Sequence, residues 1–177
     1  MNQLKELLVE ELQDLLQAEG QLTKALPKMA AAAHHPKLRE AFEKHLFQTQ
    51  GQVERLKVIF SLLGEKPETK PCKAMEGLVA EGEETIEEGK NKEALSADLA
   101  LIAAAQKVEH YEISGYGTLR GLARQIGEYE VSELLTHTLG EEESADFLLS
   151  EIAKPIIQQA TSITLEKKTG KKQTAGV

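Results

Sequence analysis

Residues 4–26 read LKELLVEELQDLLQAEGQLTKAL, and leucines recur in this stretch at intervals of mostly three and four. The recurring positions are Leu4, Leu8, Leu12, Leu15, Leu22 and Leu26. Apolar residues at this spacing form one face of an amphipathic helix, and that face packs into a core. Glu19 falls on the same face, where an apolar side chain would be expected. The stretch therefore predicts a long helix that carries a carboxylate at a core position.

Three further stretches have the same periodicity, so we expect four long helices, at residues 2–33, 37–63, 93–126 and 128–159. Pro27 and Pro155 are expected to kink or interrupt the helices that contain them. Residues 64–73 (GEKPETKPCK) are a predicted loop, and residues 74–89 a short acidic helix. Short links make neighbouring helices antiparallel, whereas the long link lets the second and third long helices run parallel. The predicted fold is all-α, a ferritin-like four-helix bundle whose long crossover carries a short fifth helix.

The composition narrows the class of protein. The chain has 177 residues, which favours a single domain, expected at residues 1–160, followed by a polar and disordered tail at 161–177. The net charge of −8 disfavours nucleic-acid binding. No apolar run approaches the ~18 residues of a membrane span, and the N-terminus is too charged for a signal peptide. The single cysteine, Cys72, fits a reducing compartment. We therefore expect a cytoplasmic protein that binds neither membrane nor nucleic acid.

Polar residues interrupt the apolar face of every long helix near its midpoint. Besides Glu19 these are His45, Thr49 and Gln52, then Glu109 and Glu112, then Glu142 or Glu143 with Asp146. In a bundle the four midpoints meet at one level. Burying unpaired carboxylates there costs several kcal/mol, and their mutual repulsion adds to it. Divalent cations would offset this cost, and carboxylates with one or two histidines bind two metals in bundle cores.

Each of these residues also has a structural interpretation. Glu19 could lie at the edge of its stripe and reach solvent, and His45 could be a hydrogen-bonded core histidine. Glu109 and Glu112 could pair with arginines of a neighbouring chain, and Tyr116 is expected to serve packing. Phosphate-binding glycine loops and CxxC pairs are absent from the sequence.

At this point the sequence resembles the YciF-type branch of the ferritin-like superfamily, which comprises bacterial stress-associated proteins. The resemblance covers roughly residues 2–160. It is carried by Ala18-Glu19, by His45-x3-Thr49-x2-Gln52-x2-Arg55-Leu56, by Cys72-x2-Met75-Glu76-Gly77-Leu78, by Ala104-Ala-Gln-Lys-Val-Glu109-His-Tyr-Glu112 with Tyr116-Gly-Thr-Leu, and by Glu142-Glu143-x2-Asp146. The resemblance implies a homodimer as well as the fold.

The superfamily's usual pattern is one glutamate on the first and third helices and Glu-x-x-His on the second and fourth. Glu19 and Glu112 match the single glutamates, and Glu143-x-x-Asp146 matches the fourth helix with aspartate in place of histidine. The second helix has no Glu-x-x-His and presents His45, Thr49 and Gln52 instead. The predicted ligand set is Glu19, His45, Gln52, Glu109, Glu112, Glu143 and Asp146. Such an oxygen-rich set would suit Mn or Mg as well as Fe.

The fourth helix leaves two assignments open. Glu142 lies nearer the centre of the stripe formed by Leu135, Leu139 and Leu149, so helical geometry slightly favours it. The spacing of the superfamily motif favours Glu143, and we assign Glu143 on that ground.

Two functions compete at this stage. One is a dinuclear Fe or Mn protein of the stress response that acts on a small oxidant, peroxide or oxygen, through metals roughly 3.5–4 Å apart. The other is a non-catalytic helical stress or interaction module, in which the buried acids are protonated or hydrogen-bonded. The sequence assigns no catalytic residue, and stoichiometric metal distinguishes the two functions.

Overall fold

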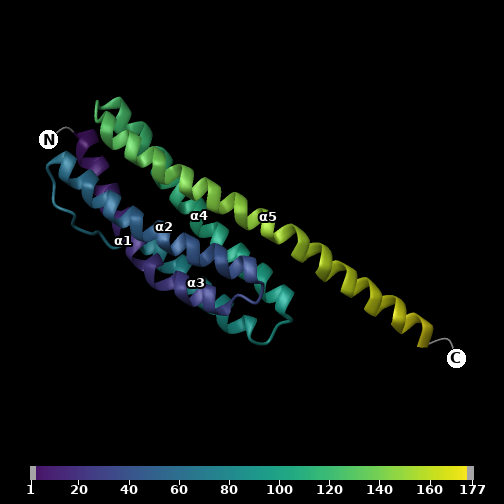
Figure 1. The fold of residues 1–177 in the computed structure, drawn as a ribbon. Helices are drawn as coiled ribbons and strands as arrows, with labels where there is room; N and C mark the ends of the chain where they lie inside the picture. Colours follow the sequence, from purple (N-terminus) through teal and green to yellow (C-terminus); the bar gives the residue numbers. More distant parts are fainter. Residues whose placement is uncertain (1–2, 175–177) are drawn as a thin grey trace.

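The computed structural model describes residues 3–174, and helices are the only regular secondary structure among them. The helices are α1 (Gln3–Ala32), α2 (Pro36–Leu63), α3 (Lys73–Gly89), α4 (Ala94–Gln125) and α5 (Tyr129–Thr174). Figure 1 shows α1, α2, α4 and α5 lying alongside one another as a bundle. The predicted all-α, ferritin-like four-helix bundle is confirmed, and α3 is the short helix on the crossover between α2 and α4.

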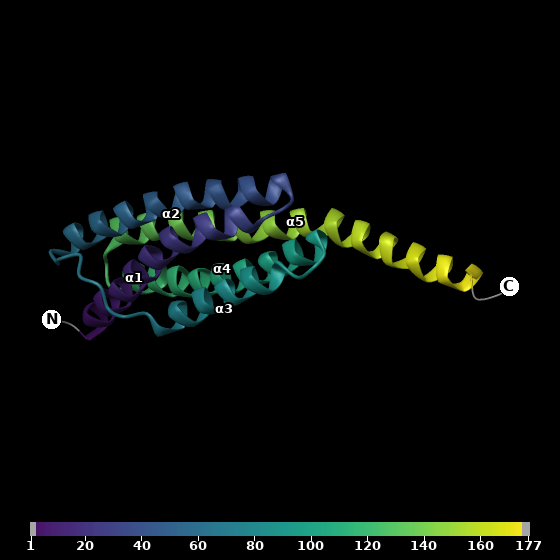
Figure 2. The ribbon, with the colours of Figure 1, turned by 90° about the horizontal axis from the view of Figure 1, so that it is seen from below.

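Two hairpins, α1–α2 and α4–α5, form the bundle, and α3 packs against α1 and α4 (Figure 2). Gly64 ends α2 with φ of 75° and Gly127 follows α4 with φ of 88°, a left-handed conformation that glycine adopts without strain. The link between α1 and α2 is held to α4 by the buried Asp98. Its carboxylate accepts hydrogen bonds of 2.8 Å from the backbone N–H groups of both His34 and His35.

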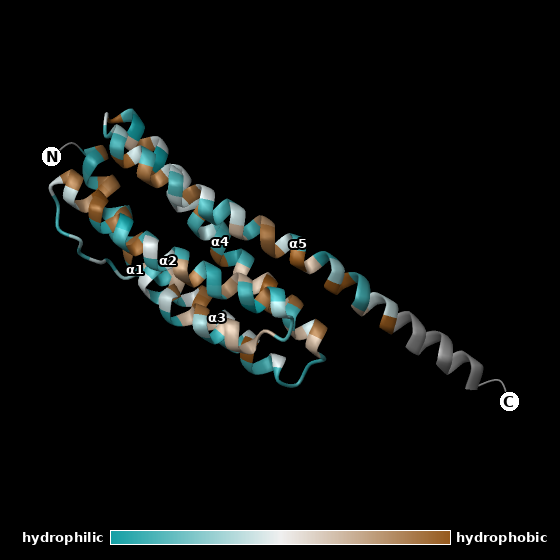
Figure 3. Cartoon of the chain, in the orientation of Figure 1, coloured by the Kyte–Doolittle hydropathy of each residue, from teal (hydrophilic) through white to brown (hydrophobic). Residues whose placement is uncertain are grey.

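The apolar core is divided in two along the bundle axis. One cluster contains Leu22 and Leu26 of α1 with Leu149 of α5, and the other contains Leu12 of α1 with Leu135 of α5. Figure 3 shows hydrophobic residues recurring between hydrophilic ones along each helix. The division leaves one level of the bundle, near the middle of α1, α2 and α4 and in the first third of α5, where the buried side chains are polar.

The expected interruption of a helix at proline does not occur, because α1 and α5 run through Pro27 and Pro155. A kink at these prolines, the other expectation, stays a prediction. The predicted disordered tail is helical to Thr174, where α5 projects beyond the bundle (Figure 1). Extending a formed helix adds a hydrogen bond per residue with no new nucleation, and the residues after 160 contain no proline. Residues 1–2 and 175–177 lie outside the described part of the chain.

No described helix combines the length and the apolarity that crossing a membrane requires.

Candidate metal centre

A layer of polar side chains fills the level between the two apolar clusters. We call it the polar layer, and its members are all buried: Glu19, His45, Thr49, Gln52, Glu109, Glu112 and Glu142. Every long helix contributes at least one of them. The layer arises because each helix places a polar residue on its inward stripe at the same height, as the sequence predicted.

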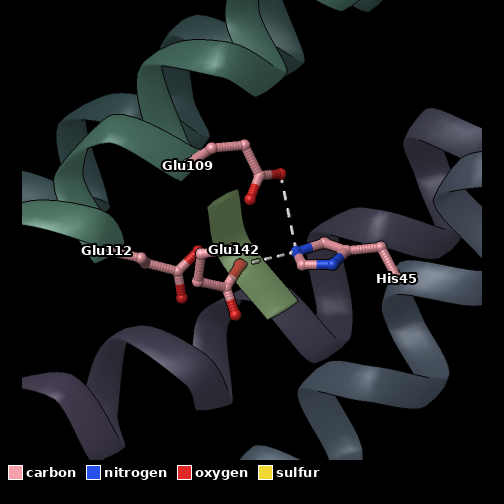
Figure 4. Close-up of side chains that lie close together, drawn as sticks. All are labelled: His45, Glu109, Glu112 and Glu142. Atoms are coloured by element: carbon pink, nitrogen blue, oxygen red, sulfur yellow. Dashed lines mark ion pairs between the residues drawn. The ribbon is translucent and has the colours of Figure 1, made fainter. Parts of the chain in front are cut away.

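Four members of the layer converge closely enough to bind an ion. His45 of α2, Glu109 and Glu112 of α4 and Glu142 of α5 each offer one ligand atom, and these atoms lie within 4.8 Å of one another. We call these four residues the quartet (Figure 4). Nε2 of His45 lies 3.5 Å from a carboxylate oxygen of Glu109 and 3.4 Å from one of Glu142. Ligands bound about 2.1 Å from one metal lie up to about 4.2 Å apart, so a small contraction would close the quartet around a cation.

Glu19 brings a further carboxylate from α1 to the same level. Its side chain is fully buried, and its Oε1 accepts a hydrogen bond from the hydroxyl of Tyr116. Its Oε2 has no hydrogen-bond partner. Burial raises the pKa of Glu112 most, and the negative charge of Glu19 raises it further, so the two carboxylates lie within electrostatic reach of each other. The quartet and Glu19 together give four carboxylates and one imidazole.

Unpaired polar atoms are concentrated in this layer. Among the described residues, the buried side-chain N and O atoms that lack a hydrogen-bond partner belong to the polar layer with one exception, Nδ1 of His35. Neither carboxylate oxygen of Glu112 has a hydrogen-bond partner, and neither ring nitrogen of His45 has one, although its Nε2 makes the two ion-pair contacts given above. Buried polar groups are normally hydrogen-bonded, so a cluster of unpaired acceptors calls for a ligand. Carboxylate oxygens and an imidazole are a donor set that suits Fe and Mn, so these residues fit the metal predicted from the sequence.

Electrostatics at the layer favour the neutral acids when no cation is present. Burial raises the pKa values of Glu19, Glu109 and Glu112 well above the ordinary range, and the charges of neighbouring glutamates raise them further. Burial also raises the pKa of Glu142, while the nearby His45 acts in the opposite direction. A metal would therefore displace protons as it binds, and its affinity would increase with pH.

Gln52 links the quartet to the surface. Its Nε2 donates to an oxygen of Glu142 and, at 3.1 Å, to Oε2 of Glu141. Glu141 in turn accepts from Nη1 of Arg55 at 2.8 Å, and Arg55 also donates to the hydroxyl of Thr138 at 2.6 Å. This network fixes the orientation of the Glu142 carboxylate. Oε1 of Gln52 has no hydrogen-bond partner, so this oxygen could also act as a metal ligand, as predicted from the sequence.

The fourth helix corrects one sequence assignment. Glu142 is fully buried, whereas Glu143 is exposed, so the prediction that Glu143 faces inward is wrong. A rotation of about 100° per residue separates adjacent side chains on a helix. The stripe through Leu135, Leu139 and Leu149 is buried and fixes that rotation, which turns Glu142 towards His45.

The structure does not bring Asp146 into the quartet. Its side chain is 24% exposed, and its Oδ1 accepts a 2.9 Å hydrogen bond from Nε2 of Gln106. Nε2 of His110 lies 3.4 Å from the same oxygen. The carboxylate of Asp146 is thus engaged with α4 on the outer side of the bundle. Gln106 precedes Glu109 by one turn, and its partner on α5 could not be identified from spacing alone.

Tyr116 has a second role, as a hydrogen-bond donor, that its place in the sequence does not indicate. The ring is fully buried, as expected for packing, but its hydroxyl also donates to Glu19. The two residues lie on different helices, so only the three-dimensional arrangement reveals the pair.

Comparison with known proteins agrees with the fold and the motifs. Residues 3–162 match the family described as Domain of unknown function (DUF892). Protein YciF of Escherichia coli strain K12 is 46% identical over 154 residues, which cover 86% of this chain and 92% of that protein.

Solved structures give the same result. The crystal structure of the E. coli stress protein YciF matches with a TM-score of 0.85 and 42% identity, covering 89% of this chain and 99% of that one. YcfI from Rhodopseudomonas palustris matches with a TM-score of 0.79 and 41% identity, covering 83% of this chain and 92% of that one. The chain therefore belongs to the DUF892 family and is a relative of the stress protein YciF.

Proposed function

We propose that the protein binds Fe or Mn in a dinuclear centre at the polar layer and serves in the stress response. One observation carries this proposal: unpaired buried acceptors from all four long helices gather between two apolar clusters. Apolar side chains of similar size would stabilise the fold at this level at lower cost. A bound cation would offset the cost of burying the carboxylates at this level.

The residues have distinct parts in the proposal. Glu19, His45, Glu109, Glu112 and Glu142 hold the ions. Gln52 orients Glu142 through the hydrogen bond that joins them, and the Tyr116 hydroxyl orients Glu19. The predominance of oxygen donors suits Fe or Mn better than a thiolate-preferring metal. A bound redox metal would supply the reactivity towards peroxide or oxygen that a stress role requires.

The experiment is elemental mass spectrometry on protein produced with added Fe and Mn. The expected content is about two metals per chain, as in other carboxylate-bridged two-metal sites. A metal content below about 0.2 ions per chain, in protein that circular dichroism shows to be folded, would contradict the proposal. The proposed cytoplasmic location and homodimer are separate matters, tested by cell fractionation and by light scattering.

The second candidate is the non-catalytic module. The raised pKa values of the buried glutamates favour it, because protonated acids can donate hydrogen bonds within the layer. Under this alternative the layer is structural, and the protein purified with added Fe and Mn holds no stoichiometric metal.

A further inference from the structure

A small pocket opens between α2 and α5 and ends at the candidate metal centre. Its volume is about 40 Å³. Lys44, Gln48, Ser144 and Leu148 line its outer part, where Lys44, Ser144 and Leu148 are exposed. His45 and Glu109, two members of the quartet, line its inner part. The pocket thus extends from the surface to two residues of the quartet.

The pattern of residual exposure in the quartet points to the same side. The side chain of His45 is 7% exposed and that of Glu109 is 4% exposed, whereas that of Glu142 is fully enclosed. Glu112 is fully enclosed as well. The two residues that retain contact with the exterior are therefore the two that line the inner end of this pocket.

Two larger cavities of the described chain do not reach the quartet. A cavity of about 650 Å³ lies among residues of α1, α3 and α4 that include Lys28, Glu83 and Leu101, and one of about 270 Å³ lies between α1 and α4 around Asp14 and Ser114. Neither has a quartet residue in its lining, although both are far larger. Size alone does not identify a route to the site.

We propose that the pocket between α2 and α5 is the route by which a divalent cation reaches the quartet, an inference that rests on the proposed metal centre. A volume of about 40 Å³ admits about one water molecule, so a hydrated ion sheds most of its water at the mouth. The amide oxygen of Gln48 and the hydroxyl of Ser144 are neutral oxygen donors that replace this water. The ammonium group of Lys44 opposes the cation electrostatically and slows its passage.

The test compares rates of metal loading in two serine variants. Ser144→Phe places a large ring in the mouth, and Ser114→Phe makes the same change at an exposed position of α4 that faces the other cavity. Co²⁺ is mixed with apoprotein and its visible absorption is followed by stopped flow. We expect Ser144→Phe to slow loading about tenfold or more and Ser114→Phe to change it less than about twofold, with equal final stoichiometry.

Two further variants test the route in the opposite direction. Leu148→Ala widens the mouth and should speed loading. Lys44→Gln removes the repulsive charge and should speed loading at low ionic strength, with the difference fading as salt is added. These variants keep the test decisive if Ser144→Phe does not fold.

The outcomes separate the two proposals. Equal loading rates in wild type, Leu148→Ala and every folded variant at Ser144 would overturn the route while leaving the metal centre intact. A wild-type protein that takes up no Co²⁺, Fe²⁺ or Mn²⁺ at equilibrium would overturn the metal centre and the route with it.

Discussion

At the scale of single residues, Glu142 and Glu143 are adjacent in α5 and lie in opposite environments. Glu142 is enclosed, accepts a hydrogen bond from Gln52 and lies 3.4 Å from the imidazole of His45. Glu143 is exposed. The pair offers identical chemistry at two positions, one inside the proposed centre and one outside it.

Replacing Glu142 by Gln should lower metal affinity by at least about 10–100-fold, the loss typical of a group that supports or forms a metal site. Glu143→Gln makes the same chemical change at the surface and should leave affinity unchanged. Isothermal titration calorimetry with Mn²⁺ measures both. Equal affinities for the two variants would show that Glu142 holds no ion.

The Tyr116 hydroxyl is the hydrogen-bond donor to Glu19 Oε1, and both groups are buried. Tyr116→Phe leaves that oxygen unpaired and should lower the free energy of unfolding by about 1–3 kcal/mol in urea denaturation. Tyr129→Phe is the matched control, because Tyr129 is 67% exposed. If both substitutions lower the free energy of unfolding by the same small amount, the hydrogen bond from Tyr116 to Glu19 does not contribute to stability.

At the scale of elements, the polar layer interrupts the core that the four long helices share. The acids on α1, α4 and α5 have raised pKa values because burial disfavours their charged forms. The native protein therefore binds more protons than the unfolded chain at pH values above the ordinary glutamate pKa of about 4.3. The contribution of these groups to the free energy of unfolding is fully present below the ordinary glutamate pKa. It is lost as the pH rises through their raised pKa values.

The metal-free protein should accordingly lose stability at the layer as the pH rises above the ordinary glutamate pKa of about 4.3. The double variant Glu19→Gln with Glu112→Gln removes two of the responsible groups and should show a flatter dependence. Urea denaturation at several pH values measures the difference between the two proteins. If the free energy of unfolding has the same pH dependence in the wild type and the double variant, burial does not disfavour the charged forms of Glu19 and Glu112.

The last part of α5 projects beyond the bundle (Figure 1). Among the residues of α5 up to 163, whose burial the structure describes, Ile156 is the last that is buried. A chain that ends at Ala160 should keep its metal content and unfold within about 1 kcal/mol of the full chain, since surface changes usually fall in that range. Thermal denaturation followed by circular dichroism checks the stability. A loss of several kcal/mol would show that the projecting helix packs on something the bundle requires.

Periodicity in the sequence was sufficient to predict the four long helices and the level at which their polar residues meet. Periodicity could not decide which of Glu142 and Glu143 faces inward, because that depends on the rotation that packing imposes on α5. The extension of α5 was missed for a related reason: polar composition suggests disorder, whereas a helix that has already formed extends easily. The partners of Tyr116 and Asp146 lie on other helices and have no signature in local sequence.

At the scale of the whole molecule, the bundle encloses the polar layer, and two of its residues, His45 and Glu109, line a small pocket between α2 and α5. The chain shares its helical fold with the E. coli stress protein YciF over most of its length. The central claim is that the layer exists to bind metal.

Anomalous diffraction at the Fe and Mn absorption edges, from crystals of protein produced with both metals, tests this claim most directly. We expect anomalous peaks at the polar layer, within bonding distance of the ligand atoms of His45, Glu109, Glu112 and Glu142. A map without peaks at that level, from protein whose buried glutamates bond only to one another and to their neighbours, would contradict it.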